Sequence, residues 1–398
     1  MHTRKALIVG GGFAGLAAAL ALEKAGLEPH VFEKNPEPTE LAAGVSLWGN
    51  AIRALTKLGL ARKAIDAGDI ITTATLMNSR GRIISTCNIG EADRALGYPS
   101  IVIHRQDLLR ILCDALDPAR LTCNAAATHV RQVQGQSSNT QLGGRVILHT
   151  SDGHHHTAPV LIGADGNRSL VRTQTLGEEQ LRYSGYTSWR GVLEFPTSRW
   201  PSGHAAEVWG RGQRFGITRL DKHRMYWWAT RNAPATDPTH KHDATAHAAL
   251  LTFFKAWVDP IPDLIRLTDP ATIIRTDIYD RKPSKRWGAG RVTTIGDAAH
   301  APTPNLGQGA CMVIEDAVVL AKWLGEAAAG RLEVPAALRA YENERYARTT
   351  MVTKVSWRLG AVGQWTNPVV CAVRDFVTSL TPQFMFLQNH KSVVGFEA

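Results

Sequence analysis

Three glycines near the N-terminus constrain the fold of this chain more than any other feature. Gly10, Gly12 and Gly15 form a G-x-G-x-x-G pattern. The flanking residues predict that 4–34 form a strand, a glycine turn, a helix and a second strand, which is one βαβ unit of a parallel sheet. Glycines at such a turn let the backbone at the helix N-terminus approach a pyrophosphate group.

An acidic residue completes this pattern. Glu33 ends the second predicted strand, eighteen residues after Gly15. Its carboxylate is placed there to accept hydrogen bonds from a ribose diol. Glycines that served only tight packing would leave Glu33 unexplained. The two features together predict an adenine dinucleotide site, but they do not distinguish NAD from FAD.

A later segment favours FAD. Asp297 follows a buried strand predicted at 291–295, and the loop 304–309 then leads into a long helix. A carboxylate at a strand end can bind a ribityl hydroxyl, and the amides at the helix start can face a pyrophosphate or the edge of a flavin. The alternative interpretation is that Asp297 only caps a helix.

The chain also contains a second kind of sheet. Residues 178–281 are rich in aromatic residues and in alternating apolar and polar positions, unlike the βαβ material on either side. We therefore expect an α/β fold in which a Rossmann-like FAD-binding domain is interrupted by a substrate domain with a largely antiparallel sheet, followed by C-terminal helices. The expected boundaries are 1–70, 101–177 and 282–334 for the FAD-binding domain, 71–100 and 178–281 for the substrate domain, and 335–398 for the helical region.

Composition argues against several other classes of protein. The net charge is +10, but no basic run interleaves with aromatic residues, so nucleic acid is not an expected partner. The five cysteines lack metal-ligand spacing, so no metal site is expected. Without an export-signal pattern or an apolar segment long enough to span a bilayer, a cytoplasmic protein is expected. Whether it is a monomer or a homodimer stays open.

Three motifs together resemble those of the class A flavoprotein monooxygenases, the para-hydroxybenzoate hydroxylase-like family. They are the glycine fingerprint, Gly163–Gly166 with Ser169 and Arg172, and the pair Gly296-Asp297; His104–Leu108 matches as well. The resemblance implies hydroxylation of a small aromatic substrate with FAD, O2 and transiently bound NADPH or NADH, through a hydroperoxide at flavin C4a.

The resemblance also implies a set of FAD-binding positions. They are Gly10, Gly12, Phe13, Ala14, Gly15, Glu33, Lys34, Ser46, Arg105, Ala127, Asp165, Asp297, Pro304, Gly307, Gln308, Gly309 and Ala310. Only one glycine fingerprint is present, which argues against a second dinucleotide domain for the nicotinamide. His300 follows the Gly-Asp pair, and for this residue we favour a structural role over that of a general base.

Within the family, several segments resemble the branch of urate hydroxylases and alkylquinolone hydroxylases, which act on bicyclic nitrogen heteroaromatics. These segments are 43–48, 184–190, 207–210 and 363–365. The resemblance implies that Arg214 and Tyr226 face the flavin ring and act in catalysis, although a role in folding stays open for both. The alternative function is that of an FAD-dependent dehydrogenase or reductase that does not activate oxygen.

The residues after 357 are apolar and carry few charges. Such a segment can close the substrate channel, form a dimer contact, or make peripheral contact with a membrane that holds a lipophilic substrate. Packing into the core is the simplest expectation. Most of the tryptophans Trp48, Trp189, Trp227 and Trp228 are also expected in the core, although they could line an aromatic pocket.

Overall fold

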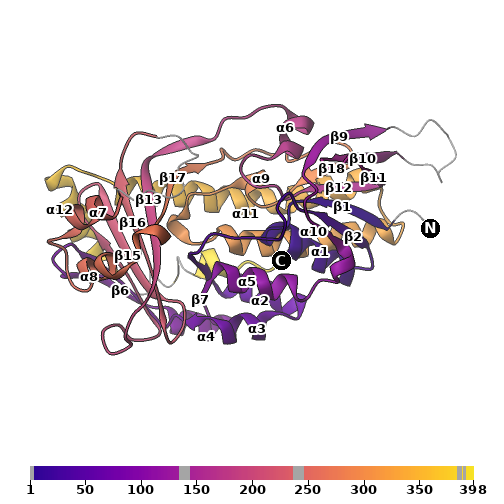
Figure 1. The fold of residues 1–398 in the computed structure, drawn as a ribbon. Helices are drawn as coiled ribbons and strands as arrows, with labels where there is room; N and C mark the ends of the chain where they lie inside the picture. The colour runs from indigo at the N-terminus through magenta and orange to yellow at the C-terminus, as the bar shows by residue number, and fades with distance from the viewer. Residues whose placement is uncertain (1–3, 134–143, 236–245, 383–387, 389–390) are drawn as a thin grey trace.

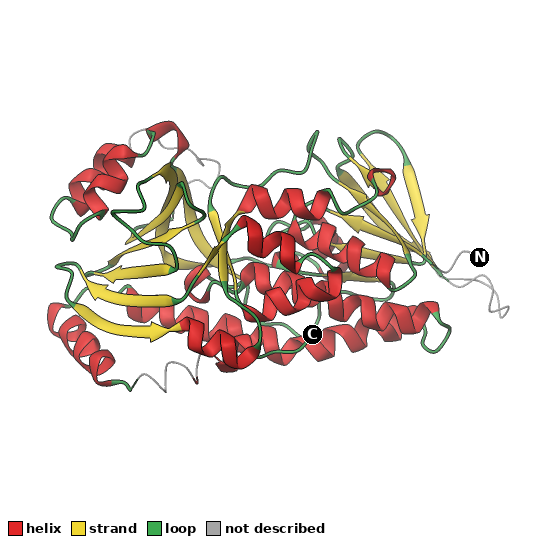
Figure 2. Cartoon of the chain, turned by 90° about the horizontal axis from the view of Figure 1, so that it is seen from below, coloured by secondary structure: helices red, strands yellow, loops and turns green. Residues whose placement is uncertain are grey.

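The computed structural model describes residues 4–133, 144–235, 246–382, 388 and 391–398. The molecule is elongated, with the parallel sheet and the N-terminus at one end and a large antiparallel sheet at the other (Figure 1). Helices fill the middle of the molecule when it is seen from below (Figure 2). The α/β fold with a largely antiparallel second sheet, which the sequence predicted, is confirmed.

The first sheet has five parallel strands in the order β18-β12-β1-β2-β8. They are β1 (Lys5–Val9), β2 (Glu28–Phe32), β8 (Leu121–Thr122), β12 (Val160–Gly163) and β18 (Val292–Thr294). In this register Ile8 lies opposite both Val31 and Ile162. The chain thus returns to the sheet from distant positions, and the carboxyl ends of the strands meet at one edge.

Strand β1 is covered on both faces, which explains why it is apolar along almost its whole length. Ala6 and Ile8 pack into the core that contains helices α1 (Phe13–Lys24) and α10 (Gly309–Ala328). Leu7 and Val9 point to the opposite face and pack against the three-stranded sheet β11-β10-β9. That sheet consists of β9 (Ala127–Val133), β10 (Arg145–Thr150) and β11 (His155–Ala158).

The large sheet has seven strands in the order β17-β13-β16-β15-β14-β5-β6. They are β5 (Thr73–Asn78), β6 (Ile83–Asn88), β13 (Arg182–Glu194), β14 (His204–Trp209), β15 (Gln213–Arg219), β16 (Arg224–Asn232) and β17 (Ile274–Asp280). All neighbouring pairs are antiparallel except β14 and β5. One face packs around Trp227, Phe215 and Phe254, and the other face turns toward the first sheet.

Shorter elements connect the two sheets. A small sheet contains β3 (Gly44–Leu47), β4 (Asp69–Ile70) and β7 (Ile101–His104). The remaining helices are α2 (Gly49–Leu58), α3 (Ala61–Ala67), α4 (Ile89–Leu96), α5 (Arg105–Cys113), α6 (Leu170–Leu176), α7 (Ala246–Phe254), α8 (Ile261–Leu267), α9 (Asp297–His300), α11 (Val334–Gly363) and α12 (Pro368–Leu380). None of the helices in the described part of the chain is long and apolar enough to cross a bilayer.

The expectation that the apolar C-terminal segment packs into the core is wrong for α12. Its side chains Val369, Phe376 and Leu380 are 69%, 63% and 64% exposed. Cys371 and Arg374 are its buried residues. Hydropathy alone could not separate these outcomes, because an amphipathic helix has the same sequence pattern whether its apolar face is covered or free. The apolar residues 384–387 lie outside the described residues.

A buried network of charges joins α10 to α11. Arg345 pairs with Glu315 at 2.6 Å and with Asp316 at 2.7 Å, and all three side chains are fully buried. Arg348 adds a second cation at 3.1 Å from Glu315. Two arginines therefore neutralise two carboxylates that could not otherwise stay ionised in the core.

Removal of one of these cations should destabilise the whole protein. We expect Arg345→Leu to lower the free energy of unfolding by about 3–5 kcal/mol, because it leaves buried carboxylates without compensation. The measurement is urea denaturation followed by tryptophan fluorescence. The matched control is Arg62→Leu, which breaks an exposed pair with Asp66 and should change the midpoint little. Equal effects of the two substitutions would contradict this account of the network.

Candidate active site

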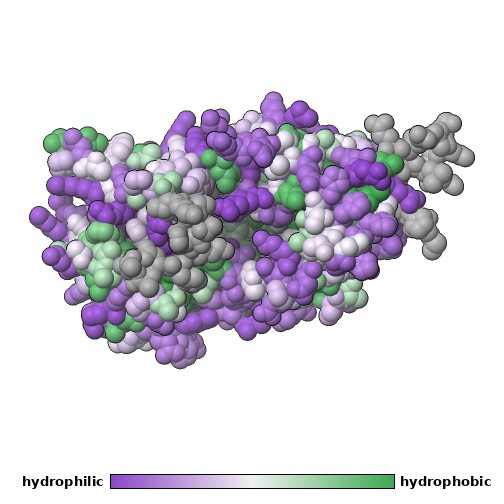
Figure 3. All heavy atoms as spheres, turned by 45° about the horizontal axis from the view of Figure 1, so that its top comes forward, coloured by the Kyte–Doolittle hydropathy of each residue, from purple (hydrophilic) through white to green (hydrophobic). Residues whose placement is uncertain are grey.

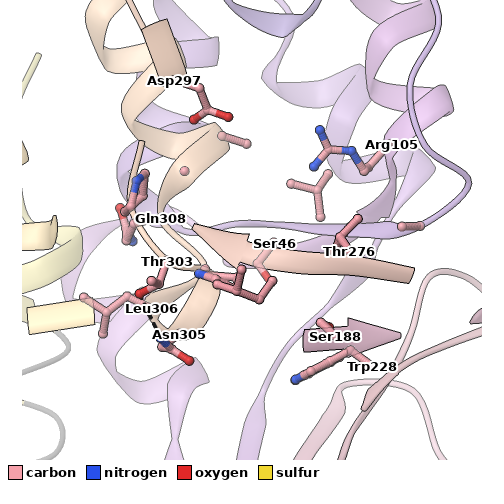
Figure 4. A pocket seen from close by; sticks show the side chains of 18 of the residues that line it. Ser46, Arg105, Ser188, Trp228, Thr276, Asp297, Thr303, Asn305, Leu306 and Gln308 are labelled. Carbon is pink, nitrogen blue, oxygen red and sulfur yellow. Dashed lines mark hydrogen bonds between the residues drawn. The ribbon is translucent and has the colours of Figure 1, made fainter. Parts of the chain in front are cut away.

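One cavity of about 2030 Å³ runs between the two sheets. Single small ligands usually occupy pockets of roughly 300–1,000 Å³, so the cavity has room for a dinucleotide and a further compound. A hollow between the two parts of the molecule is visible in Figure 3. Figure 4 shows Asp297 and Arg105 on opposite sides of one end of the cavity, and Ser188 and Trp228 at the other end.

The glycine turn leaves open space at the N-terminus of α1. A Cβ atom on Gly10 would lie 2.5 Å from the Ala164 carbonyl oxygen, and one on Gly15 would lie 1.8 Å from the Gly10 carbonyl oxygen. A Cβ on Gly12 would meet no atom closer than 3.8 Å. Gly10 and Gly15 thus permit close packing of the backbone, whereas Gly12 faces the cavity, where backbone amides can bind a phosphate.

Glu33 has two backbone partners that the sequence did not predict. One carboxylate oxygen accepts a hydrogen bond from the Gly11 amide at 2.6 Å, and the other accepts one from the Asn35 amide at 2.9 Å. The side chain is buried, yet it lines the cavity. Glu33 therefore fixes the glycine loop while it lies on the cavity wall.

Asp297 lies at the carboxyl end of the sheet, directly after β18. It follows Gly296, whose φ of +60° is in the left-handed region that favours glycine. The side chain is exposed to the cavity, which its carboxylate faces (Figure 4). Desolvation by the surrounding protein raises the pKa of Asp297, against the opposing effects of His300 and Arg105. The carboxyl group can therefore form hydrogen bonds with a group placed in the cavity.

The loop before α10 is held by the opposite wall. The Trp48 indole donates a hydrogen bond to the Gly307 carbonyl oxygen at 3.1 Å. The Asn50 side chain donates one to the Gln308 side-chain oxygen at 2.9 Å. The side-chain oxygen of Gln308 is therefore engaged within the protein. The first amides of α10 form a second helix N-terminus at the cavity, which suits a negatively charged or electron-rich group.

Arg105 is already paired in this structure. Its guanidinium lies 2.6 Å from a Glu40 carboxylate oxygen and 4.9 Å from the centre of the Phe13 ring. Both neighbours line the cavity with it. The pair partly neutralises Arg105, so a phosphate that approached it would compete with Glu40.

Asp165 organises the turn between β12 and α6. Its two oxygens accept hydrogen bonds from the Ser169 hydroxyl at 2.5 Å and from the Val171 amide at 3.1 Å. Burial raises the pKa of Asp165, and these hydrogen bonds oppose the rise. Nearby, Arg172 of α6 lies 2.5 Å from Glu179 and so holds the segment that follows α6. Asp165 thus has a structural role as well as a position on the cavity wall.

The far end of the cavity is formed by the large sheet. Arg214 is buried and lies 3.1 Å from Glu207 and 2.6 Å from the Asn305 side-chain oxygen. Tyr226 lies so close to Gly44 that a Cβ there would be 2.5 Å from its ring. Burial raises the pKa of Tyr226, and the nearby Arg190 opposes the rise. The phenol therefore stays protonated at neutral pH.

Nearly all residues singled out from the sequence meet at this cavity. Gly15 does not line it, because its role is in packing. The others that line it are Gly10, Gly12, Phe13, Ala14, Glu33, Lys34, Ser46, Arg105, Ala127, Asp165, Asp297, Pro304, Gly307, Gln308, Gly309, Ala310, Arg214 and Tyr226. Trp189 and Trp227 are core residues, whereas Trp48 and Trp228 line the cavity. Within the described residues, no group of His, Cys, Asp and Glu could hold a metal ion.

Other cavity residues were not anticipated. Glu40 carried no local sequence signal, and Asn305 lies in the loop 304–309 but its partner was not predicted, because the partners Arg105 and Arg214 are 65 and 91 residues away. His300 has the structural role that was favoured: its Nε2 atom lies 2.6 Å from Asp316 and its ring packs on Trp287.

Comparisons with known proteins agree with this geometry. The model of the FAD binding domain family matches residues 3–356. Aurachin C monooxygenase/isomerase of Stigmatella aurantiaca is 39% identical over 93% of this chain and 92% of its own. The 2-heptyl-3-hydroxy-4(1H)-quinolone synthase of Pseudomonas aeruginosa is 31% identical over 94% of each chain. The crystal structure of Klebsiella pneumoniae HpxO with FAD and uric acid has a TM-score of 0.88 at 25% identity, and covers 98% of this chain and 96% of that one.

The chain belongs to the class A flavoprotein monooxygenases. The prediction of an FAD-dependent monooxygenase is therefore confirmed, and the dehydrogenase alternative is disfavoured. The residues of this flavoprotein fit the cofactor: space is open over Gly12, and an acidic side chain faces the cavity at each of two strand ends. The N-termini of α1 and α10 supply backbone amides that suit the phosphate groups of the cofactor.

Two glycine substitutions should separate cofactor binding from packing. We expect Gly12→Ala to leave the melting temperature of the apoprotein nearly unchanged and to weaken FAD binding at least about tenfold, because the methyl group enters the phosphate space. Gly15→Ala should instead destabilise the apoprotein, because its Cβ meets backbone. FAD fluorescence quenching and thermal unfolding measure the two effects.

Gly325→Ala, inside α10, is the matched control because a Cβ there meets only Ala25 at 3.6 Å. It should leave the FAD affinity unchanged and should raise the stability only slightly. FAD binding by Gly12→Ala with unaltered affinity would refute the placement of the pyrophosphate.

Proposed function

We propose that this flavoprotein hydroxylates a bicyclic heteroaromatic compound that carries an alkyl chain, of the 2-alkyl-4(1H)-quinolone type, with O2 and NADH or NADPH. The observation that carries the proposal is the shape of the cavity. Beyond the dinucleotide end it has an aromatic wall, and it then continues along an apolar face of α11. The name of the Pseudomonas relative contains this ring system with a heptyl chain.

The residues assigned to FAD follow from the same geometry. Residues of the segments 1–70, 101–177 and 282–334 would hold the cofactor, with Gly12 and the α10 N-terminus at phosphate and flavin, Glu33 at the ribose, and Asp297 at the ribityl chain. When bound, FAD supplies the transfer of two electrons from the nicotinamide and the activation of O2. Segments 71–100 and 178–281 would form the substrate part, and 335–398 the helical region.

The substrate ring would lie between the large sheet and the loop 304–306. Tyr226 and Trp228 provide an aromatic wall, their ring centres 5.5 Å apart. Ser188 lies beside Trp228, and Thr276 lies on the same cavity wall; both offer hydroxyl groups (Figure 4). Aromatic faces favour a planar ring, and a few hydroxyls can orient its carbonyl or N–H group. These side chains also keep water from the reacting end.

Arg214 and Tyr226 would serve as the catalytic side chains by positioning and charge. The Arg214 guanidinium is held by Glu207 and Asn305, and its Nε atom has no hydrogen-bond partner among the described residues. A buried N–H donor without a partner is costly, and the oxygen of an anionic or carbonyl-bearing substrate could satisfy it. The neutral Tyr226 hydroxyl would hold its proton and donate or accept one hydrogen bond.

The alkyl chain would follow α11. Met351, Val355, Leu359 and Val362 all line the cavity at spacings of four, four and three residues, so they share one face of the helix. Val393 and Val394 extend this apolar surface from the C-terminal segment. Such a tract suits methylene groups, each of which contributes about 0.8 kcal/mol when buried. It is not required by urate, which has no chain.

The setting of the enzyme is part of the same proposal. The chain would work in the cytoplasm as a monomer or homodimer and take up the nicotinamide transiently, since one glycine fingerprint is present. Peripheral contact with a membrane through the C-terminal region would bring it to a lipophilic substrate.

The first test is turnover by the holoprotein. With 2-heptyl-4(1H)-quinolone as probe, we expect oxidation of NADH or NADPH to be coupled to O2 uptake and to a product heavier by one oxygen atom, with little peroxide. Urate and salicylate serve as comparison compounds. Coupled hydroxylation of one of these, without turnover of any quinolone, would refute the substrate class but not the monooxygenase activity.

A chain-length series tests the apolar tract separately. We expect kcat/KM to rise about threefold to fourfold per added methylene from 2-methyl- to 2-heptyl-4(1H)-quinolone. Val355→Asn should reduce the preference for the heptyl over the methyl compound about tenfold. Val133→Asn, at an exposed valine far from the cavity, is the matched control. An equal loss for both compounds in Val355→Asn would place the chain elsewhere.

A further inference from the structure

Helix α12 presents one continuous apolar face to the solvent. Val369, Val370, Val373, Phe376, Val377 and Leu380 are each between 40% and 69% exposed. Their spacing of three to four residues puts them on a single stripe, opposite the buried Cys371 and Arg374. Water-exposed apolar side chains on this scale indicate a surface that binds something apolar.

Neighbouring elements extend this face. Trp365, just before α12, is 40% exposed, and Ile83, at the start of β6, is 59% exposed. Strand β6 packs against α12. Both views place α12 at the outer end of the molecule, away from the N-terminus (Figures 1 and 2). Figure 3 shows a mostly hydrophilic surface, with hydrophobic side chains at this end among several scattered groups.

Unpaired arginines border the apolar face. Arg80 and Arg82 precede Ile83, and Arg211 lies in the turn whose Gly212 amide donates a hydrogen bond to the Trp365 carbonyl oxygen at 2.7 Å. All three arginines are exposed, and none forms an ion pair within the described part of the chain. On α12 itself, the one acidic side chain, Asp375, is paired with Arg374 at 2.8 Å. Among these residues, three unpaired cations therefore outweigh the one paired carboxylate.

We infer that this α12 face, together with Trp365, Ile83 and the three arginines, docks on an anionic lipid bilayer. An amphipathic helix binds at a bilayer surface by burying its apolar face among the acyl chains, while bordering cations attract anionic headgroups. A tryptophan at the edge of such a helix suits the headgroup region. A two-fold contact between copies of this chain would bring two equal basic borders together, so the charge favours the bilayer over a second copy.

Docking would place the cavity next to the lipid. Thr378 of α12 lines the cavity, and the Arg374 guanidinium lies 4.7 Å from the centre of the Trp209 ring, which lines it too. A lipophilic compound dissolved in the bilayer would then reach the α11 tract by a short path. This consequence rests on the proposed function, whereas the docking surface stands on α12 and its border.

Vesicle co-sedimentation of the holoprotein tests the surface directly. We expect binding to vesicles of phosphatidylcholine with 30% phosphatidylglycerol, and at least about tenfold weaker binding to phosphatidylcholine alone. The double variant Val373→Asp/Val377→Asp should weaken binding to the anionic vesicles at least about tenfold. Arg80→Glu/Arg82→Glu should weaken it on anionic vesicles only. Val133→Asp is the matched control and should bind as the unmodified protein does.

Two further measurements distinguish loss of membrane binding from misfolding and from a change of oligomeric state. The flavin absorption spectrum and turnover of a soluble, chainless quinolone should stay unchanged in the α12 variant, which shows that it is folded. Light scattering after size exclusion gives the oligomeric state. No binding of the unmodified protein to either vesicle would overturn the inference. Conversion of a dimer to a monomer by the α12 variant, without vesicle binding by either form, would instead assign the face to a second copy.

Discussion

The position of Asp297 on the cavity wall depends on one buried carboxylate, that of Asp316. Asp316 accepts hydrogen bonds from the Gly296 amide at 2.9 Å and from Arg345 at 2.7 Å, and it lies 2.6 Å from His300. Burial acts to raise the pKa of Asp316, but His300 and Arg345 outweigh it and the net shift is downward. The ionised carboxylate thereby fixes the Gly296 turn and the start of α9. Without it, Asp297 would lose the backbone turn that positions it, whereas the loop before α10 keeps its own contacts with Trp48 and Asn50.

Local features of the fold followed from the sequence because they are encoded by neighbours in the chain. The glycine turn and the acid at the end of β2 depend on residues within one βαβ unit, and the helix α10 depends on the residues that directly follow β18. Even there, the partners differed in detail: Glu33 was expected to bind a ribose, and it also holds the Gly11 amide. A sequence pattern identifies the chemistry that a side chain can perform, but the folded backbone decides how many partners share it.

Contacts between residues far apart in the chain could not be predicted from the sequence. The pairs Arg105–Glu40 and Arg214–Asn305 join segments 65 and 91 residues apart, and no periodicity connects such positions. The exposure of α12 was missed for a different reason, since its pattern fits a covered helix equally well. The apolar spacing of Met351, Val355, Leu359 and Val362 on α11 was readable, but only the structure shows that this face borders a cavity.

The two ends of the cavity differ in physical character. The dinucleotide end is built from backbone amides, helix N-termini and carboxylates, which the parallel sheet supplies by its topology. The substrate end is built from aromatic and aliphatic side chains of the large sheet and α11. Because the first set is mostly backbone and the second mostly side chains, substitutions at the proposed substrate end would alter a bound ring or chain without disturbing the proposed FAD site. On this proposal, substrate choice would be a property of the large sheet and α11.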